Sequence, residues 1–320
     1  MRIKYSTLLI STVLLAISAT AEAREVVDTM GRTVDIPDHP ERVVVMSEPA
    51  IAIPMIELGV NPIGSFGRAD DGTYQVGADF IDTLFGPNQK KPQGIGNNRQ
   101  VDLEKLYSMK PDLIIGTEFD VDKVKQLSTV APVYMQHYTT GHLDNFVIEE
   151  NLAKLFGKET AFQTLKEKYL EDVQETKKQL PESLENKTYL PVIIMDQINI
   201  VGEGIGVSQP LNDLGMKPFE VSNDKTHSDG SPKIVLPISA ETFGSLNPDI
   251  LVVIINWGAP DKSIEATNEA LNKLVPGWEA YMKPAREGRV IYLDGSKVFT
   301  PSFLSARYTL GEVRKWAKTK

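Results

Sequence analysis

Charged and aromatic side chains follow several predicted strands of this chain, at the points where each strand ends. The first half offers Arg68, Phe119 and Tyr138, and the second half offers Trp257, Lys297 and Phe299. In open parallel α/β sheets, ligands bind outside the carboxyl ends of the strands. A planar guanidinium binds paired anionic oxygens through two N–H groups, and aromatic faces cover the apolar parts of a large ligand. This mixture predicts a binding site for a bulky, oxygen-rich anion.

Three further residues could join that site. Arg99 precedes a short predicted helix in the first half, and His227 lies at the equivalent place in the second half. Arg307 lies inside the last predicted helix. Trp257 and Phe119 fit an ordinary core equally well, and Arg307 fits a surface ion pair equally well.

The patterns of common enzymes are absent from the sequence. It has no Gly-x-Ser-x-Gly elbow and no phosphate-binding Walker loop, and without cysteine it has no thiolate. The four histidines are spread out, whereas a zinc site needs three or four convergent ligands. We therefore assign no catalytic residue, no metal site and no cofactor. The alternative from the enzyme class is a secreted hydrolase that uses Glu48, Asp196 or His137 as acid or base.

One stretch of the chain occurs twice. The pattern at 101–116 returns at 237–253, with Glu104 matching Glu241 and each copy carrying a Pro-Asp pair before an apolar run. Proline ends a helix, and an unbroken apolar run is typical of a strand covered on both faces. A second repeated pattern, at 55–62 and 211–218, precedes the first one in each half of the chain. The repeats predict two similar lobes with a cleft between them.

The segment between the two copies is helical in pattern. Apolar residues recur at spacings of three and four from 144 to about 179, with a break at Gly157. The fold class expected is α/β, with two Rossmann-like lobes of mainly parallel sheets joined by a long connecting α-helix. The expected boundaries are a signal peptide at 1–23, a first lobe at 24–141, the connector at 142–180 and a second lobe at 181–320.

The start of the chain has the pattern of an export signal. Arg2 and Lys4 precede an apolar run that ends before Ala21 and Ala23, and the run is short for a membrane span. We expect a cleaved, soluble periplasmic protein that acts as a monomer without stable membrane insertion. The formal net charge of −9 argues against nucleic acid as a partner.

Glu104 and Glu241 fall in the first turns of their helices, behind Asp102 and Ser239 as N-caps. The helix dipole favours an acid there, which would explain each glutamate by itself. It does not explain why both lobes carry one at the same place.

The chain resembles the periplasmic iron-siderophore-binding proteins of ABC importers, the helical-backbone class III cluster. The stretches that carry the resemblance are 27–32 with 40–44, 102–114, 127–132, and 239–249. It implies that Glu104 and Glu241 dock onto arginines of the permease. It also implies that the ligand lies in a shallow interlobe cleft near Arg99 and Phe119, with the loop around His227 closing from the other lobe. Many relatives carry a glutamate where this chain has Ile53, so no docking role is assigned there.

The expected function is therefore the capture of a ferric siderophore and its delivery to an inner-membrane ABC permease. The siderophore is a ligand and not a cofactor. Relatives that bind haem or cobalamin share the scaffold, so haem, cobalamin or a bare metal ion stay open as alternatives. Catecholate, hydroxamate and citrate-type siderophores are not distinguished by these residues.

Overall fold

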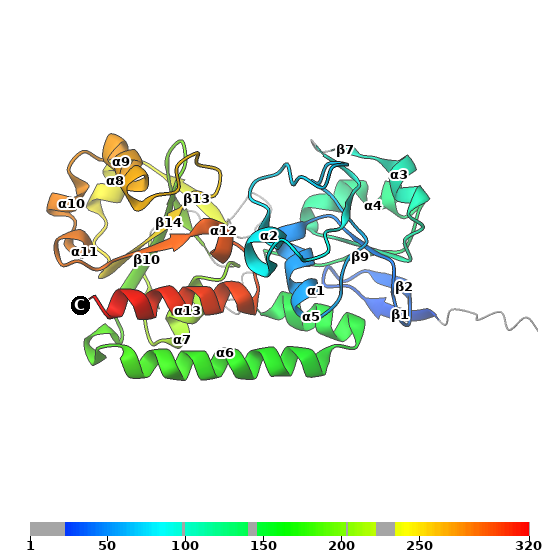
Figure 1. Cartoon of the computed structure of the whole chain (residues 1–320), viewed down its shortest axis with the longest axis horizontal. Coiled ribbons are helices and arrows are strands. Elements are labelled where there is room, and N and C mark those ends of the chain that lie inside the picture. Colours follow the sequence, from blue (N-terminus) through cyan, green and yellow to red (C-terminus); the bar gives the residue numbers. More distant parts are fainter. Residues whose placement is uncertain (1–22, 98–99, 140–145, 203, 222–233, 320) are drawn as a thin grey trace, which may run out of the picture.

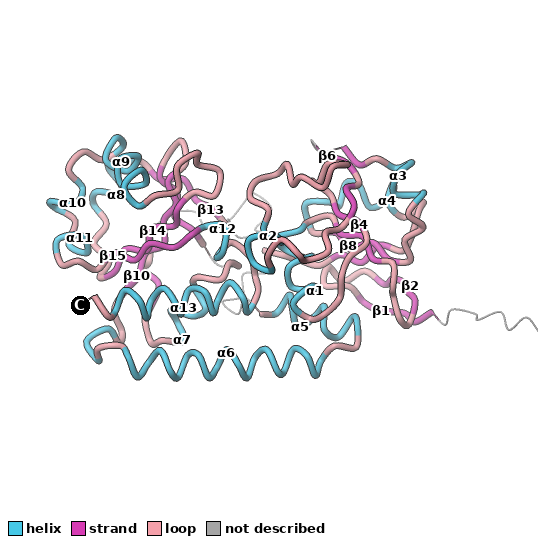
Figure 2. Tube along the Cα trace, in the orientation of Figure 1, coloured by secondary structure: helices cyan, strands magenta, loops and turns pink. Residues whose placement is uncertain are grey.

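The chain forms two α/β lobes, each built around its own sheet; the long helix α6 runs along the second lobe, and α5 links it to the first (Figures 1 and 2). The structure is a computed structural model that describes residues 23–97, 100–139, 146–202, 204–221 and 234–319. The expected fold class is confirmed. The predicted signal peptide lies almost entirely outside the described residues.

The sheet of the first lobe is wholly parallel, in the order β5-β4-β3-β8-β9. Its strands are β3 (Val43–Val45), β4 (Gly64–Ser65), β5 (Gln93–Gly94), β8 (Leu113–Gly116) and β9 (Val133–Met135). The strands are short, and the three central apolar ones, β3, β8 and β9, are fully buried, as the apolar runs predict. Around them lie η1 (Glu48–Ala52), α1 (Ile53–Glu57), α2 (Phe80–Phe85), α3 (Leu103–Ser108), η2 (Glu118–Lys123) and α4 (Val124–Leu127).

A separate hairpin precedes this sheet. Strands β1 (Ala23–Val27) and β2 (Thr33–Pro37) pair antiparallel around Gly31, whose φ of 79° is a conformation that glycine adopts readily. The turn is fastened to the edge of the sheet, because Thr29 N–H donates to the Met135 carbonyl at 3.2 Å. A second small antiparallel pair, β6 (Gly96–Asn97) with β7 (Gln100–Val101), leads into α3.

The sheet of the second lobe is mixed, in the order β13-β11-β10-β14-β15, with β12 beside β10. Its strands are β10 (Thr188–Ile194), β11 (Ile198–Val201), β12 (Lys217–Pro218), β13 (Val235–Ile238), β14 (Ile250–Ile255) and β15 (Val290–Asp294). Strand β11 runs antiparallel to both of its neighbours, and the sequence did not predict it. The other elements are η3 (Glu182–Leu184), α7 (Ser208–Asp213), α8 (Ala240–Ser245), α9 (Ile264–Leu274), α10 (Trp278–Tyr281), α11 (Lys283–Arg286), α12 (Gly295–Val298) and α13 (Phe303–Ala317).

The repeated Pro-Asp pairs have the same task in both lobes. The Asp112 carboxylate accepts the backbone N–H groups of Glu41 and Arg42, at 2.8 and 2.9 Å, just before β3. The Asp249 carboxylate accepts the N–H of Thr188, at 3.1 Å, at the start of β10. Each aspartate therefore ties the strand that follows it to the start of the neighbouring strand.

The connector consists of α5 (Val147–Phe156) and α6 (Glu159–Gln179), with Gly157 in the left-handed conformation between them. Helix α13 of the second lobe lies along α6 (Figure 1). Phe303 of α13 stacks on Phe146 with ring centroids 3.9 Å apart and also meets Phe162 and Tyr169. These contacts bury large aromatic surfaces, so they hold the connector firmly to the second lobe.

Candidate functional site

Trp257 meets residues of both lobes at their junction. It follows β14 in the second lobe, is half-buried, and its ring centroid lies 4.3 Å from that of Phe299. On the side of the first lobe, its centroid lies 6.3 Å from that of Phe80 in α2. A Cβ atom on Gly77 would lie 2.9 Å from Trp257 Nε1, so the backbone of the first lobe also approaches the indole closely.

Lys297 carries a positive charge in the segment that leads to Phe299. It belongs to α12, two residues before Phe299, and its Nζ lies 4.9 Å from the centroid of the Tyr308 ring. A cation over a ring face is stabilised by the ring quadrupole. Burial raises the pKa of Tyr308, so its hydroxyl stays protonated at neutral pH. The segment that carries Phe299 therefore also offers an ammonium group held over a tyrosine ring.

Phe119 contributes an exposed ring from the first lobe, with 58% of its surface accessible. It lies in η2, directly after β8, beside Glu118. The Glu118 carboxylate accepts the backbone N–H groups of Tyr138 and Thr139, at 2.8 and 2.7 Å. Nε2 of His137 is 3.6 Å from Glu118 Oε1. These contacts fix the loop that presents Phe119 at the carboxyl end of the sheet.

The prediction for Tyr138 is corrected. Tyr138 is only 9% exposed, and its ring belongs to the core of the first lobe. Burial, with the nearby Glu118 charge, raises the pKa of its hydroxyl. The strand end that was expected to present this ring to a ligand turns it inward instead.

The prediction for Arg68 is also corrected, because its side chain has no exposed surface. Its guanidinium donates to both oxygens of Glu48, at 2.8 and 2.6 Å, and to Asp79 at 2.9 and 3.1 Å. Against the effect of burial, the hydrogen bond from Arg68 lowers the pKa of Asp79 to about 2. Arg68 therefore holds the loop that leads to Gly77 and α2, and it is not a surface cation.

The same contacts exclude Glu48 as an exposed acid. It is fully buried in η1, and burial raises its pKa against the hydrogen bonds from Arg68 and Ser65. Asp196 is exposed in the turn between β10 and β11. The carboxylates named for the hydrolase alternative therefore do not share one environment.

Arg307 points toward the connector. Its Nε donates to Asp172 of α6 at 2.6 Å, and Arg314 adds a second pair with the same carboxylate at 3.7 Å. The expectation that Arg307 contacts the ligand is replaced by the surface ion pair that the sequence also allowed. Arg99 and His227 lie outside the described residues.

Glu104 and Glu241 are both exposed, in the first turns of α3 and α8. The predicted N-caps form, because Asp102 accepts the N–H of Lys105 and Ser239 accepts that of Thr242. Figure 1 places α3 and α8 on the same side of the molecule, one per lobe and opposite α6. The two acids are therefore available to a partner that spans both lobes.

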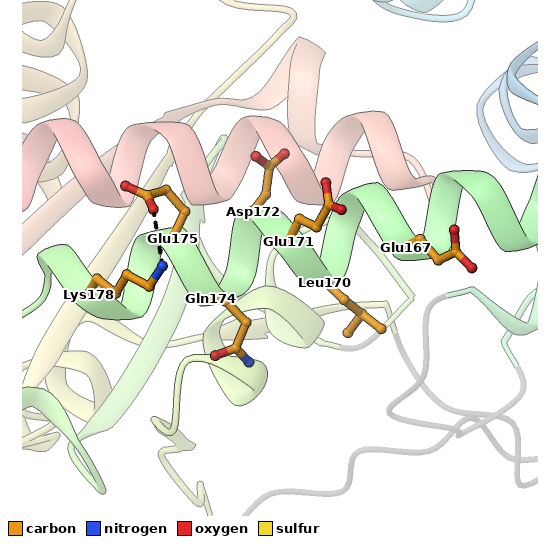
Figure 3. Close-up of a pocket in the computed structure, with 7 residues that line it drawn as sticks. All are labelled: Glu167, Leu170, Glu171, Asp172, Gln174, Glu175 and Lys178. Carbon is orange, nitrogen blue, oxygen red and sulfur yellow. Dashed lines mark ion pairs between the residues drawn. The ribbon is translucent and has the colours of Figure 1, made fainter.

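A groove on the connector has the wrong charge for an anionic ligand. It runs along the surface of α6 and is lined mostly by acidic and polar side chains (Figure 3): Glu167, Leu170, Glu171, Asp172, Gln174, Glu175 and Lys178. It lies on the side away from α3 and α8 (Figure 1). Carboxylates repel an anion, so we do not place the ligand there.

Some residues of the junction were not singled out from the sequence. Gly77 and Phe80 lie in a glycine-rich region whose course gives no periodic signal, although Gly77 has a φ of 131° that favours glycine. Within the described ranges, no group of three or more histidine, aspartate or glutamate side chains is placed to hold a metal ion. In the same ranges, no helix combines the length and the apolar character that crossing a bilayer requires.

Comparisons with known proteins agree with this architecture. The family model described as "Periplasmic binding protein" matches residues 76–296. The Fe(3+)-citrate-binding protein YfmC of Bacillus subtilis is 26% identical over 279 residues, covering 87% of this chain and 80% of YfmC. Two solved Bacillus subtilis structures share the fold. The petrobactin-binding protein YclQ has a TM-score of 0.68, 20% identity, and coverage of 93% of this chain and 100% of that one. The triscatecholate siderophore-binding protein FeuA with ferri-bacillibactin has a TM-score of 0.67, 20% identity, and coverage of 93% and 99%.

The family match spans parts of both lobes and the whole connector, including Trp257, Phe119 and both exposed glutamates. The family is one of binding proteins and not of enzymes. The chain therefore belongs to the periplasmic binding protein family.

Proposed function

We propose that this protein binds a ferric siderophore where its two lobes meet and delivers it to an inner-membrane ABC permease. The observation that carries the proposal is the junction where Trp257 and Phe299 of one lobe meet Gly77 and Phe80 of the other. Relatives in the same family bind iron chelates, as the names of YfmC and FeuA state.

The chemistry of the junction suits such a ligand. A ferric siderophore presents anionic oxygens around the iron and apolar groups at its periphery. Lys297 supplies a positive charge, and Trp257, Phe299 and the exposed Phe119 supply aromatic faces. Arg99 and His227 stay proposed contacts on the strength of the resemblance. Arg68 holds the loop that leads to Gly77 through its ion pairs, whereas Arg307 pairs with Asp172 on the connector.

Delivery would use the two exposed glutamates. Glu104 and Glu241 fit a partner with one basic side chain opposite each lobe. Exposed ion pairs are individually weak, at roughly 0–1 kcal/mol each, which suits a transient complex. We propose that the mature protein is a periplasmic monomer, released by cleavage after Ala23 and divided into lobes at 24–141 and 181–320 by a connector at 142–180.

Calorimetric titration of the mature protein tests this function. The panel contains ferric citrate, a ferric hydroxamate and a ferric catecholate, with the iron-free chelators, haem, cobalamin and zinc as competing ligands. The proposal predicts one-to-one binding of at least one ferric chelate, at least tenfold tighter than its iron-free form. Binding of haem, cobalamin or zinc with no ferric chelate bound would refute it.

A further inference from the structure

An exposed tyrosine stands beside the exposed glutamate of the first lobe. Tyr107 follows Glu104 by three residues in α3, and 68% of its surface is accessible. Residues three apart in a helix are neighbours on one face. A ring and a carboxylate therefore lie side by side at the tip of this lobe.

The second lobe reaches a similar arrangement by a different route. The residue that follows Glu241 by three in α8 is Gly244, which has no side chain to offer. Tyr281 of α10 covers that place. A Cβ atom on Gly244 would lie 3.3 Å from the Tyr281 hydroxyl oxygen and 3.8 and 3.9 Å from two of its ring atoms. Tyr281 is 46% exposed, so a partly exposed tyrosine lies against Gly244, about one helical turn from Glu241.

The surroundings of the two pairs match in detail. Besides the N-caps, Ser108 and Ser245 donate to the carbonyls of Lys105 and Thr242 in the same way, each at 2.7 Å. Helices α3 and α8 lie on the same side of the molecule (Figure 1). Both lobes thus present a carboxylate and an aromatic ring at corresponding places, although the two rings come from unrelated positions in the sequence.

A carboxylate next to a ring face is suited to a guanidinium. The carboxylate accepts two N–H groups from the edge of the guanidinium, while the ring stacks against its face. An ammonium group would use the carboxylate but gain less from the planar stacking. Tyrosine and arginine are also the residues that most often dominate binding energy at protein interfaces, together with tryptophan.

We propose that Tyr107 and Tyr281 complete the two docking sites of Glu104 and Glu241, so that each lobe holds one arginine side chain of the permease between an acid and an aromatic ring. The inference rests on the proposed function for the identity of the partner. It adds that the tyrosines bind the arginines together with the acids, so that acid and ring act as one unit within each lobe.

The test is a double-mutant cycle in each lobe. The mature protein carries a fluorescent label, and its binding to right-side-out inner-membrane vesicles of the source bacterium is measured as a saturation curve. The variants are Glu104→Gln, Tyr107→Ala and their double mutant, with Glu241→Gln, Tyr281→Ala and their double mutant for the second lobe. Each tyrosine change is expected to weaken binding about five- to thirtyfold, the range for a cation–π contact that becomes partly desolvated. Each glutamate change is expected to cost a similar factor, because the stacked ring takes the ion pair partly out of water and makes it stronger than a fully exposed pair.

Non-additivity is the decisive result. Within a lobe, the double mutant is expected to bind only about two- to threefold more weakly than whichever of its two single mutants binds less tightly, because both changes remove the same arginine contact. Combining Tyr107→Ala with Tyr281→Ala is expected to multiply the two losses, since the lobes hold different arginines. Additive losses within a lobe, or tyrosine variants that bind like the wild type, would overturn the arginine-binding sites.

Control variants separate this result from damage to the fold. Tyr107→Phe and Tyr281→Phe keep the ring and should bind within about threefold of the wild type. Leu170→Ala removes an exposed apolar side chain from α6, on the opposite side of the molecule, and should have no effect. Melting temperatures identify any variant that is unfolded. If an alanine variant is unfolded, the phenylalanine variant and the double-mutant cycle of the other lobe test the tyrosine's role in docking.

Ferric-chelate binding by each variant separates a failure of the tyrosine inference from a failure of the proposed function. If all variants bind the chelate normally and only the glutamate variants lose docking, the tyrosine inference is wrong and the proposed function is unaffected. Failure of the wild type to bind these vesicles, or unchanged binding after Glu104→Gln and Glu241→Gln together, would overturn the docking step itself. Failure of chelate binding in the wild type would count against the proposed function independently of the vesicle result.

Discussion

Glu57 of α1 and Glu149 of α5 both accept a hydrogen bond from the first turn of α13, on consecutive backbone amides. Leu304 N–H donates to Glu57 Oε2 at 3.1 Å, and Phe303 N–H donates to Glu149 Oε2 at 3.3 Å. Glu149 is fully buried, and its Oε1 has no hydrogen-bond partner in the part of the chain that the structure describes. The first lobe, the connector and the second lobe therefore meet at two carboxyl groups.

Because of these two carboxyl groups, we expect the protein to become less stable as the pH rises toward neutrality. Burial raises the pKa of Glu57 to about 7, and burial with the nearby Glu57 charge raises the pKa of Glu149 well above its usual range. The folded protein thus binds protons more tightly than the unfolded chain. The free energy of unfolding should decrease as the pH rises from about 4.5, by on the order of 3 kcal/mol at pH 7 from Glu57 alone.

Urea unfolding of Glu149→Gln checks this prediction. Glutamine keeps an acceptor for Phe303 N–H but cannot ionise, so the variant should lose much of the decline in urea midpoint between pH 5 and pH 7.5. Glu150→Gln, next in sequence and paired with Lys154 at the surface, is the matched control and should behave like the wild type. Asp79 and Asp249, with pKa values of about 2, titrate below this window. An identical slope in wild type and Glu149→Gln would contradict the prediction.

Arg68→Ala should strongly destabilise the first lobe. It leaves Glu48 buried without its cation, and breaking a buried ion pair from one side typically costs about 3–5 kcal/mol. Chemical denaturation measures the effect, and adding Glu48→Gln should restore part of the loss by removing the unpaired charge. Arg286→Ala, at an exposed arginine, should change stability by less than about 0.5 kcal/mol. Equal effects of Arg68→Ala and Arg286→Ala would show that Arg68 is not a buried structural cation.

Gly77→Ala should disturb the contact between the lobes. The new Cβ would meet Trp257 Nε1, in a backbone conformation with φ of 131° that side chains rarely adopt. We expect a loss of about 1–3 kcal/mol together with a shift of the tryptophan emission maximum. Gly311→Ala in α13 is the control, since its Cβ would find no atom within 4 Å, and it should leave stability unchanged or raise it by about 0.5–1 kcal/mol. An unshifted emission in Gly77→Ala would mean that Trp257 does not meet the first lobe.

The parts of the fold that depend on local signals could be predicted from the sequence. The break at Gly157 and the Pro-Asp strand starts follow from glycine and proline chemistry within a few residues. Strand β11 could not be predicted in the same way, because its antiparallel place between β10 and β13 depends on pairing with a segment about 35 residues further along.

The candidate site was harder to predict for the same reason. Position at a strand end correctly identifies where Trp257, Lys297 and Phe119 emerge, but it says nothing about what lies opposite each side chain. Arg68 is enclosed because Glu48 and Asp79 approach it from two other segments, and Arg307 is drawn to Asp172 of the connector. The repeat could not predict Tyr281, because this residue lies in another helix and covers the place where Gly244 has no side chain.

Tryptophan fluorescence during titration with the ferric chelate that binds best tests the central claim most directly. A ferric chelate between the lobes lies next to Trp257, whereas Trp278 is buried in the second lobe. The account predicts strong, saturable quenching in the wild type, retained in Trp316→Phe and largely lost in Trp257→Phe. Quenching that is equally strong in Trp257→Phe, or saturable binding that leaves the emission unchanged, would place the ligand away from the junction and contradict the account.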